Sequence, residues 1–335
     1  MKKRITLIII LLVTGVCFGQ AQLSFDTSAT VKNSPSLYGI VVSVRDSVIY
    51  NKNFNGTGAS DLFNDQSLTK CIGALLVGIA IDKGFIKSVD EKIADWFPEL
   101  KKDSDGRKGE ITLRQIMNQA SGLSHENLES LSGVSDYLSL PDPSGYILKS
   151  PMLTDPGKVF HYNNAASHLV SVILTRSTRM NTLSFAEKYL FGPLGIIDVS
   201  WAKMNDGYYD GCGLLSVHLR TGDLVKIGSL LLHDGKFGQQ AIVSKNWIDG
   251  ILHPAVSYNT EWGFENSRYA LCWYHAVYKG SDLVYCQGWG GQYLIVIPEL
   301  KAVIAVNQNH EGATAPRQAF IFTRKIFPII YAQIR

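Results

Sequence analysis

The sequence predicts an α+β fold in which both chain ends contribute strands to one antiparallel sheet with flanking helices, and a mainly helical lobe is inserted between them. Strand patterns lie near the N-terminus and in the last third of the 335-residue chain, whereas helical patterns fill the middle. No repeat, low-complexity tract or flexible linker separates these parts. We therefore expect one domain over residues 22–335, with the helical lobe at roughly 85–205.

The first residues read as a secretory signal peptide over residues 1–21. A basic stretch at 2–4 precedes a mostly apolar run at 5–16 and small residues at 19–21. The apolar run is too short for a comfortable transmembrane helix, and no later segment has the length of one. We expect an exported protein, periplasmic or extracellular. A lipid anchor at Cys17 is the less favoured alternative, because Val16 stands where a small residue is expected.

The composition and charge of the chain limit the kinds of molecule that it can bind. Hydrophobic residues make up 46% of the chain and charged residues 18%, as in a globular protein with a sizeable core. Three of the 32 Lys and Arg residues and none of the 29 Asp and Glu residues fall in the signal peptide, so 29 of each sign remain. A neutral mature chain lacks the basic surface that nucleic acid requires, so we expect no nucleic-acid partner.

The first part of the mature chain predicts a hairpin followed by a buried helix. Residues 38–44 and 48–54 are rich in β-branched and aromatic residues, with a short turn between them. The apolar run after Ser67 predicts a buried helix to about Lys83, closed by Gly84.

Most of the remaining chain up to residue 252 reads as helix and loop. Helical patterns lie at 86–93, 111–119, 164–175, 184–190, from about 221, and at 246–252. Thr112 is the expected N-cap of the second of these. Residues 101–109 read as a charged surface loop, and 124–150 has a mixed pattern broken by prolines.

The last third returns to strand patterns and ends in a helix. Candidate strands lie at 270–279, 283–287, 292–297 and 302–308. An amphipathic pattern over 317–334 predicts the closing helix.

Four cysteines follow the signal peptide: Cys71, Cys212, Cys272 and Cys286. An exported protein can form disulfides, and four cysteines allow three pairings. All four lie in apolar or glycine-rich surroundings, and a chain of this length does not need disulfides to fold. We therefore expect buried free thiols. No Cys and His cluster has the spacing of a zinc site, so no metal is expected.

The start of the buried helix carries a candidate nucleophile and base. Ser67 and Lys70 are three positions apart in Ser67-Leu68-Thr69-Lys70, so they share one helix face. A lysine one turn from a serine hydroxyl can activate it. The pattern alone is weak, because it also describes a surface serine near a solvated lysine.

Two further stretches strengthen this interpretation. Tyr162-Asn163-Asn164 follows a Pro-Gly turn, and residues 287–292 read Gln-Gly-Trp-Gly-Gly-Gln before a strand. In this order and spacing the three stretches resemble the motifs of the serine β-lactamase and penicillin-binding-protein superfamily. The chain looks closest to the class C-related branch, which holds esterases, D-amino-acid peptidases and 6-aminohexanoate-oligomer hydrolases. Phrases at 79–84, 112–116, 119–123 and 213–216 are similar to that branch, and the resemblance covers most of the mature chain.

The resemblance implies an acyl-enzyme mechanism without a metal or an organic cofactor. Ser67 would be the nucleophile, Lys70 and Tyr162 would transfer protons, and Asn164 would hold the lysine and the substrate carbonyl. Burial lowers the pKa of a lysine, and a nearby cation favours a phenolate, so each group could tune the other. Which of them accepts the Ser67 proton stays open. Deacylation would reuse the same pair, because Glu187 has the wrong order and context for a water-activating glutamate.

The third stretch departs from the family pattern. Relatives carry Lys-Thr-Gly or His-x-Gly, whereas this chain reads Cys286-Gln287-Gly288 without a basic side chain. Gly288 and Gly290 suit a strand that approaches a ligand closely. A backbone N–H near Trp289 could complete an oxyanion hole with that of Ser67. The missing cation puts carboxylate recognition in doubt, and Trp289 suggests an apolar wall for the substrate.

The sequence therefore predicts an exported serine hydrolase that cleaves a small-molecule ester, amide or peptide. A β-lactamase or D-Ala-D-Ala-type peptidase is the alternative within enzymes. A penicillin-binding sensor that acylates without turnover, and a structural envelope protein, are the alternatives outside enzymes. The residues do not identify the substrate or the oligomeric state.

Overall fold

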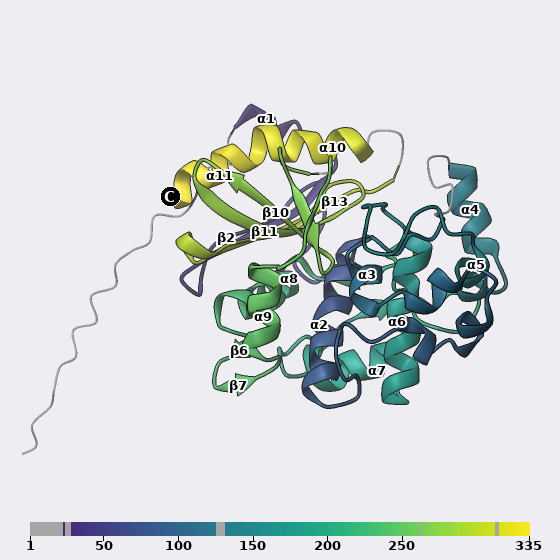
Figure 1. Ribbon diagram of the computed structural model, residues 1–335. Helices are drawn as coiled ribbons and strands as arrows, with labels where there is room; N and C mark the ends of the chain where they lie inside the picture. Colours follow the sequence, from purple (N-terminus) through teal and green to yellow (C-terminus); the bar gives the residue numbers. More distant parts are fainter. Residues whose placement is uncertain (1–22, 24–27, 125–130, 262, 312–314) are drawn as a thin grey trace, which may run out of the picture.

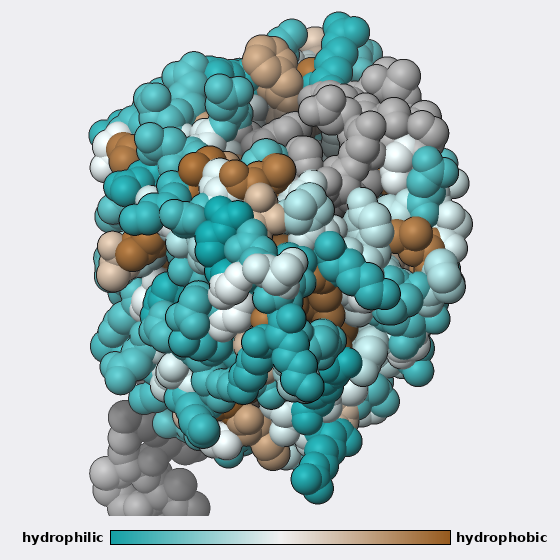
Figure 2. Space-filling model, turned by 45° about the vertical axis from the view of Figure 1, so that its right-hand side comes forward, coloured by the Kyte–Doolittle hydropathy of each residue, from teal (hydrophilic) through white to brown (hydrophobic). Residues whose placement is uncertain are grey.

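The computed structural model describes residues 23, 28–124, 131–261, 263–311 and 315–335. The predicted signal peptide, with Cys17, lies outside these residues, and so does part of the mixed segment at 124–150. Among the helices of the described ranges, none is both long enough and apolar enough to cross a membrane. The face drawn in Figure 2 is mostly hydrophilic, and its hydrophobic residues form small separate patches.

One eight-stranded antiparallel sheet forms the centre of the fold (Figure 1), in the order β2-β1-β13-β12-β11-β10-β9-β8. Its strands are β1 (Leu37–Val44), β2 (Ser47–Asn53), β8 (Tyr258–Asn259), β9 (Arg268–Ala270), β10 (Trp273–Tyr278), β11 (Ser281–Gly288), β12 (Gln292–Ile297) and β13 (Ala302–Gln308). β1 pairs with β13 antiparallel, with Val41 opposite Ala305. The prediction that both chain ends share one sheet is confirmed.

The helices lie on both faces of the sheet and beside it (Figure 1). They are α1 (Ala29–Lys32), α2 (Leu68–Asp82), α3 (Leu113–Met117), α4 (Leu131–Ser139), α5 (Pro143–Lys149), α6 (Asn164–Thr178), α7 (Thr182–Ala186), α8 (Thr221–Leu232), α9 (Lys245–Leu252), α10 (Ala315–Ile321) and α11 (Phe327–Ile334). A π-helical turn, Phe322–Ile326, joins the last two. The bounds of a helical lobe at roughly 85–205 stay a prediction.

The two faces of the sheet bury two separate hydrophobic clusters. β12 is buried along its whole length, and its side chains alternate between the faces. Leu294 and Val296 belong to the cluster that includes α2, α6 and α8. Tyr293 and Ile295 belong to the second cluster, with Phe327 of the C-terminal helix. This alternation fixes the register of the strands that carry the third motif.

The buried helix predicted after Ser67 is present as α2, and every residue from Leu68 to Ala80 is buried. α6 packs against it (Figure 1). The predicted cap of α3 is also confirmed, since Thr112 and Gln115 form a capping box.

One local prediction is wrong. No α-helix forms at 86–93: Lys92 pairs with Thr112 in an isolated bridge, the Ile93 N–H donates to the Ile111 carbonyl at 2.8 Å, and a short 3₁₀ helix, Ile93–Asp95, follows. The segment at 101–109 lies mostly at the surface, as expected, but Lys108 within it is 4% exposed and donates to Asp103 at 2.9 Å.

Five short strands outside the main sheet were not expected from the sequence, and neither was β8 within it. β3 (Phe63–Asn64), β5 (Val217–Leu219) and β4 (Ser200–Trp201) form a small sheet, and β6 (Lys236–Phe237) pairs with β7 (Gln240–Ala241). The pairing of β3 with β5 places the residues before Ser67 beside the residues after Ser216.

The expectation of four free thiols is wrong for two cysteines. Cys71 of α2 and Cys286 of β11 form a disulfide, although 215 residues separate them in the sequence. α2 packs closely on β11, so the Cα atoms of Cys71 and Cys286 lie 6.4 Å apart, which is within the range of disulfides. Cys212 and Cys272 are buried and free, as predicted.

Candidate active site

Ser67 lies at the turn into α2 with its hydroxyl free of a capping role. Gln66, the residue before it, has a φ of 52°, in the left-handed region that non-glycine residues rarely adopt. Gly213 lies against this turn, where a Cβ would come within 2.4 Å of the Gln66 carbonyl oxygen. The chain therefore turns sharply before Ser67 and needs a glycine opposite it.

Lys70 is the centre of the polar contacts around Ser67. Its side chain is 3% exposed, and Nζ donates to Ser67 Oγ at 3.0 Å and to Asn164 Oδ1 at 2.8 Å. Nζ also donates to the Cys212 carbonyl oxygen and lies 4.9 Å from the centre of the Tyr162 ring. The predicted serine, lysine, tyrosine and asparagine thus come together in one place.

The surroundings of Lys70 favour its ammonium form. Burial by itself lowers the pKa of Lys70, but the neighbouring Tyr162, Cys212 and Asp210 together raise it above its ordinary value.

Tyr162 and Asn164 are positioned by two residues that the sequence analysis missed. Asn163, not Asn164, caps α6, since its side chain accepts from the Ala166 N–H at 2.8 Å. This leaves Asn164 Oδ1 for Lys70. Gln119 accepts from the N–H groups on both sides of Tyr162, through its carbonyl from His161 and through Oε1 from Asn163.

The loop that holds the Cys212 carbonyl was also missed. Asp210 is fully buried, and its carboxylate accepts backbone N–H bonds from Cys212, Gly213, Leu215 and Ser216 at 2.6–3.1 Å. An aspartate before a Gly-x-Gly loop is the signal that could have revealed it. By folding the loop around its charge, Asp210 directs one carbonyl toward Lys70.

The third motif lies directly beside the residues before Ser67. A Cβ on Gly288 would come within 2.7 Å of the Asp65 carbonyl oxygen. Trp289 follows in the turn after β11 and is 50% exposed. Gly290 packs against His310, where a Cβ would come within 2.5 Å of the His310 Cα. Cys286 of the same motif is bonded to Cys71 in the disulfide.

Two backbone donors remain available at this junction. Within the described ranges, no hydrogen bond joins the N–H of Ser67 or of Trp289 to a protein acceptor. One lies at the start of α2 and the other in the turn after β11. Free backbone N–H groups near a nucleophile are the kind of donor that can bind a developing oxyanion.

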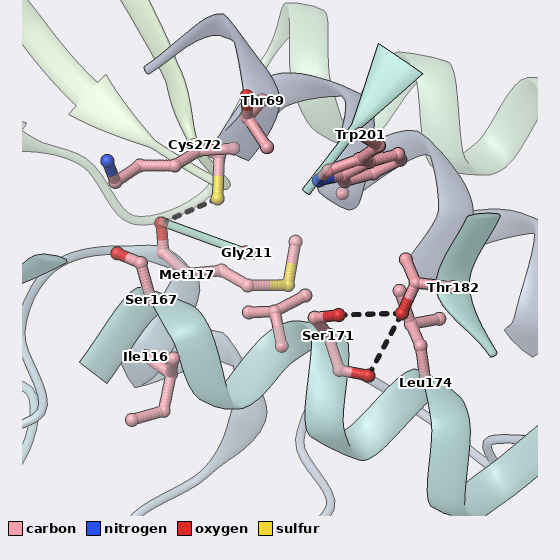
Figure 3. A pocket seen from close by; sticks show the side chains of 13 residues that line it. Thr69, Ile116, Met117, Ser167, Ser171, Leu174, Thr182, Trp201, Gly211 and Cys272 are labelled. Carbon is pink, nitrogen blue, oxygen red and sulfur yellow. Dashed lines mark hydrogen bonds between the residues drawn. The ribbon is translucent and has the colours of Figure 1, made fainter. Parts of the chain in front are cut away.

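A small cavity has Lys70 among its lining residues, and Figure 3 shows it from close by. Its volume is about 10 Å³, roughly that of one water molecule. Thr69, Ser167, Ser171 and Cys272 are among the residues that line it. It is too small for a substrate. In the described part of the chain, no group of three His, Cys, Asp or Glu side chains could hold a metal ion.

The family model described as Beta-lactamase matches residues 32–208, which is more than half of the chain. This match includes Ser67, Lys70, Tyr162 and Asn164.

One curated relative and two solved structures place this match in context. Beta-lactamase-like protein 4 of Dictyostelium discoideum is 32% identical over 149 residues, which cover 40% of this chain but only 26% of that protein. The fold is similar to a candidate 6-aminohexanoate-dimer hydrolase from Bacillus anthracis (TM-score 0.72, 17% identity, 89% of this chain and 80% of the other). It is also similar to the simvastatin synthase LovD from Aspergillus terreus (TM-score 0.68, 18% identity, 90% and 94%). At these identities the structures share the fold alone.

Proposed function

This chain belongs to the Beta-lactamase family, and on that premise we propose that it is a serine hydrolase that cleaves an ester or amide through an acyl-Ser67 intermediate. One observation carries the proposal: a buried lysine donates to Ser67 Oγ at 3.0 Å and to Asn164 Oδ1 at 2.8 Å. Ser-Lys geometry of this kind activates a nucleophile and serves no obvious purpose in packing.

Acylation in this proposal begins at the Ser67 hydroxyl. Ser67 Oγ attacks the carbonyl carbon while its proton passes to the Tyr162 oxygen, which in this proposal enters the reaction deprotonated, because the raised pKa of Lys70 favours its ammonium form. The carbonyl oxygen becomes an oxyanion that accepts from the N–H groups of Ser67 and Trp289. The bond to the leaving group then breaks, and the proton held by Tyr162 passes to the leaving oxygen or nitrogen. A water hydrolyses the acyl-enzyme with the same groups in reverse.

The proposed substrates have neutral acyl groups. Cys286 is bonded to Cys71, so the position that carries a cation in relatives is neutral here. Trp289 adds a half-exposed aromatic surface beside the site. A carboxylated β-lactam or peptidoglycan stem peptide would find no cation from this motif to pair with.

We also propose that the protein acts outside the cytoplasm. The basic and apolar start of the chain supports this, and so does the Cys71–Cys286 disulfide, since disulfides persist in oxidising compartments.

The test uses the mature chain, residues 22–335, with p-nitrophenyl hexanoate and its carboxylated analogue, the mono-p-nitrophenyl ester of adipic acid. Nitrophenol release and intact mass are followed in parallel for wild type, Ser67→Ala and Tyr162→Phe. We expect turnover of the neutral ester, a loss of at least about a thousandfold in Ser67→Ala, and a strong loss in Tyr162→Phe. The carboxylated ester should be the poorer substrate. Matching urea unfolding curves show that Ser67→Ala is folded.

Other outcomes contradict specific parts of this proposal. A stable adduct with a penicillin and no turnover would identify a penicillin-binding receptor or peptidase instead. Equal turnover in Ser67→Ala would exclude Ser67 as the nucleophile. Preference for the carboxylated ester would refute the neutral acyl group.

A further inference from the structure

Four side chains form a buried polar network directly beneath the third motif, and the proposed chemistry does not use any of them. They are Asp65, Gln292, Asn307 and Gln308, and none is more than 3% exposed. Buried side-chain amides require hydrogen-bond partners, because an unpaired one costs about 1–3 kcal/mol. Their partners show what the network holds.

Gln292 is at the centre of the network. It follows the turn that contains Trp289, and it pairs with Gly288 across the hairpin of β11 and β12. Its Nε2 donates to the carbonyl oxygens of Trp289 at 3.3 Å and of Gln308 at 2.7 Å. Its Oε1 accepts from the Gln308 N–H at 2.9 Å. Gln292 therefore attaches the turn to the neighbouring strand β13.

Gln308 supports the same turn from β13. Its side-chain Nε2 donates to the Gly291 carbonyl oxygen at 2.9 Å. A Cβ on Gly291 would come within 2.4 Å of that amide, so the two elements are in close contact. Two side-chain amides thus hold two carbonyl groups of one turn.

Asn307 extends the network to the nucleophile. Its Nδ2 donates to Gln292 Oε1 at 3.3 Å and to Asp65 Oδ1 at 2.9 Å. Asp65 lies two residues before Ser67, and its N–H donates to the Val217 carbonyl oxygen. One buried path therefore joins the turn that carries the Trp289 N–H to the segment that carries the Ser67 N–H.

We propose that Gln292 is a positioning residue, which holds the N–H of Trp289 at a fixed distance from the N–H of Ser67 through this network. The inference rests on the proposed function, in which both donors bind the oxyanion. The oxyanion forms only in the transition state, so a displaced donor lowers the rate of acylation more than it weakens substrate binding. Gln292 itself never touches the substrate.

The central test replaces Gln292 by Met, which keeps the length of the side chain and removes its hydrogen bonds. We expect kcat for p-nitrophenyl hexanoate to fall about 10- to 100-fold, less than the full loss of an oxyanion donor, with KM changed less than about twofold. Ser281→Ala is the matched control. It removes a buried hydrogen bond to Tyr331, 2.9 Å long, from the other end of β11, and it should retain wild-type kcat.

A second variant tests whether the donor matters. In Gln292→Glu the introduced carboxyl is buried and faces two carbonyl oxygens, so it retains its proton at higher pH than a free glutamate. The protonated form keeps one O–H donor. The ratio of its kcat to that of wild type should rise as the pH falls, whereas the same ratio for Gln292→Met should stay flat.

Hydrogen exchange gives a readout that does not depend on activity. We expect faster amide exchange at residues 288–292 in Gln292→Met, with no change in the rest of the sheet, and wild-type exchange in Ser67→Ala. Wild-type kcat in Gln292→Met, or a loss that comes with exchange throughout the sheet, would overturn the inference. If wild type forms no Ser67 adduct, the proposed function fails, and the exchange result alone decides whether Gln292 holds the turn.

Discussion

At the scale of single residues, neighbouring polar groups offset the cost of burying the Lys70 side chain. Lys70 is surrounded by the Cys212 carbonyl, Asn164 and the Tyr162 ring, and Asp210 supplies a buried negative charge nearby. This set keeps an ammonium ion in the interior, which would otherwise be strongly unfavourable. The arrangement fits a proton-transfer site better than a packing role.

Asp65 predicts a pH-dependent stability. Burial raises the pKa of this carboxyl well above its ordinary value, although Asn307 donates to it. The folded protein therefore keeps the Asp65 proton at pH values where the unfolded chain has lost it. Protonated Asp65 thus favours the folded state at low pH, and this stabilisation is lost as the pH rises through the pKa of Asp65 in the folded state. Asp65→Asn cannot titrate, so its stability relative to wild type should increase from pH 4 to 8 by about 1.4 kcal/mol for each unit of raised pKa.

Urea unfolding of both proteins across this pH range measures the difference. A constant difference between wild type and Asp65→Asn would show that Asp65 titrates normally in the folded state.

At the scale of elements, the disulfide connects the helix of the nucleophile to the strand of the third motif. Cys71 directly follows Lys70 in α2, and Cys286 lies two residues before Gly288 in β11. The proposed oxyanion donors lie on these two elements. A covalent link between them restricts their relative movement.

Removal of this disulfide should destabilise the protein substantially. It joins two residues with a sequence separation of 215. A crosslink across so long a loop lowers the conformational entropy of the unfolded chain, which stabilises the folded state by about 2–4 kcal/mol or more. We expect the Cys71→Ala/Cys286→Ala double variant to lose this amount in urea unfolding, and dithiothreitol to destabilise wild type but not the variant. Cys272→Ala, which removes a buried free thiol, is the control and should keep the response to dithiothreitol.

At the scale of the whole molecule, the two hydrophobic clusters lie on opposite faces of the sheet and pack against different helices. The larger one surrounds α2, which carries Lys70, whereas Tyr162 packs against the second. The second is rich in aromatic residues and lies under the C-terminal helix. There the rings of Phe264 and Phe327 contact edge to face, with 4.8 Å between the ring centres. The C-terminal helix therefore covers the face of the sheet opposite the one that packs against α2.

Phe327→Ala should destabilise the fold without affecting the chemistry. The side chain is fully buried in the second cluster, and such a truncation costs about 3–5 kcal/mol. Phe320 is 58% exposed in the same C-terminal segment, so Phe320→Ala should change stability by less than about 0.5 kcal/mol. Guanidinium unfolding separates the two, and the fraction of Phe327→Ala that stays folded should hydrolyse esters at the wild-type rate. A large loss of kcat per folded molecule would contradict this division.

The sequence by itself determined the fold class, the sheet shared by both chain ends and the local parts of the site. Strand alternation, the apolar run of α2 and the spacing of Ser67 and Lys70 are all local features, so they can be read without the tertiary structure. The resemblance of Tyr162-Asn163-Asn164 to a family motif, not a local pattern, identified Tyr162 and Asn164 as candidates. Their roles in catalysis stay a proposal.

Only the tertiary structure decided how distant segments meet at the site. The Cys71–Cys286 disulfide, the Asp210 loop beneath Lys70 and the network around Gln292 each join residues that are far apart in the sequence or bind through backbone groups. Such contacts depend on how helices and strands pack, and packing leaves no periodic signal in the chain. For the same reason, the helix expected at 86–93 gave way to pairing between Lys92 and Thr112.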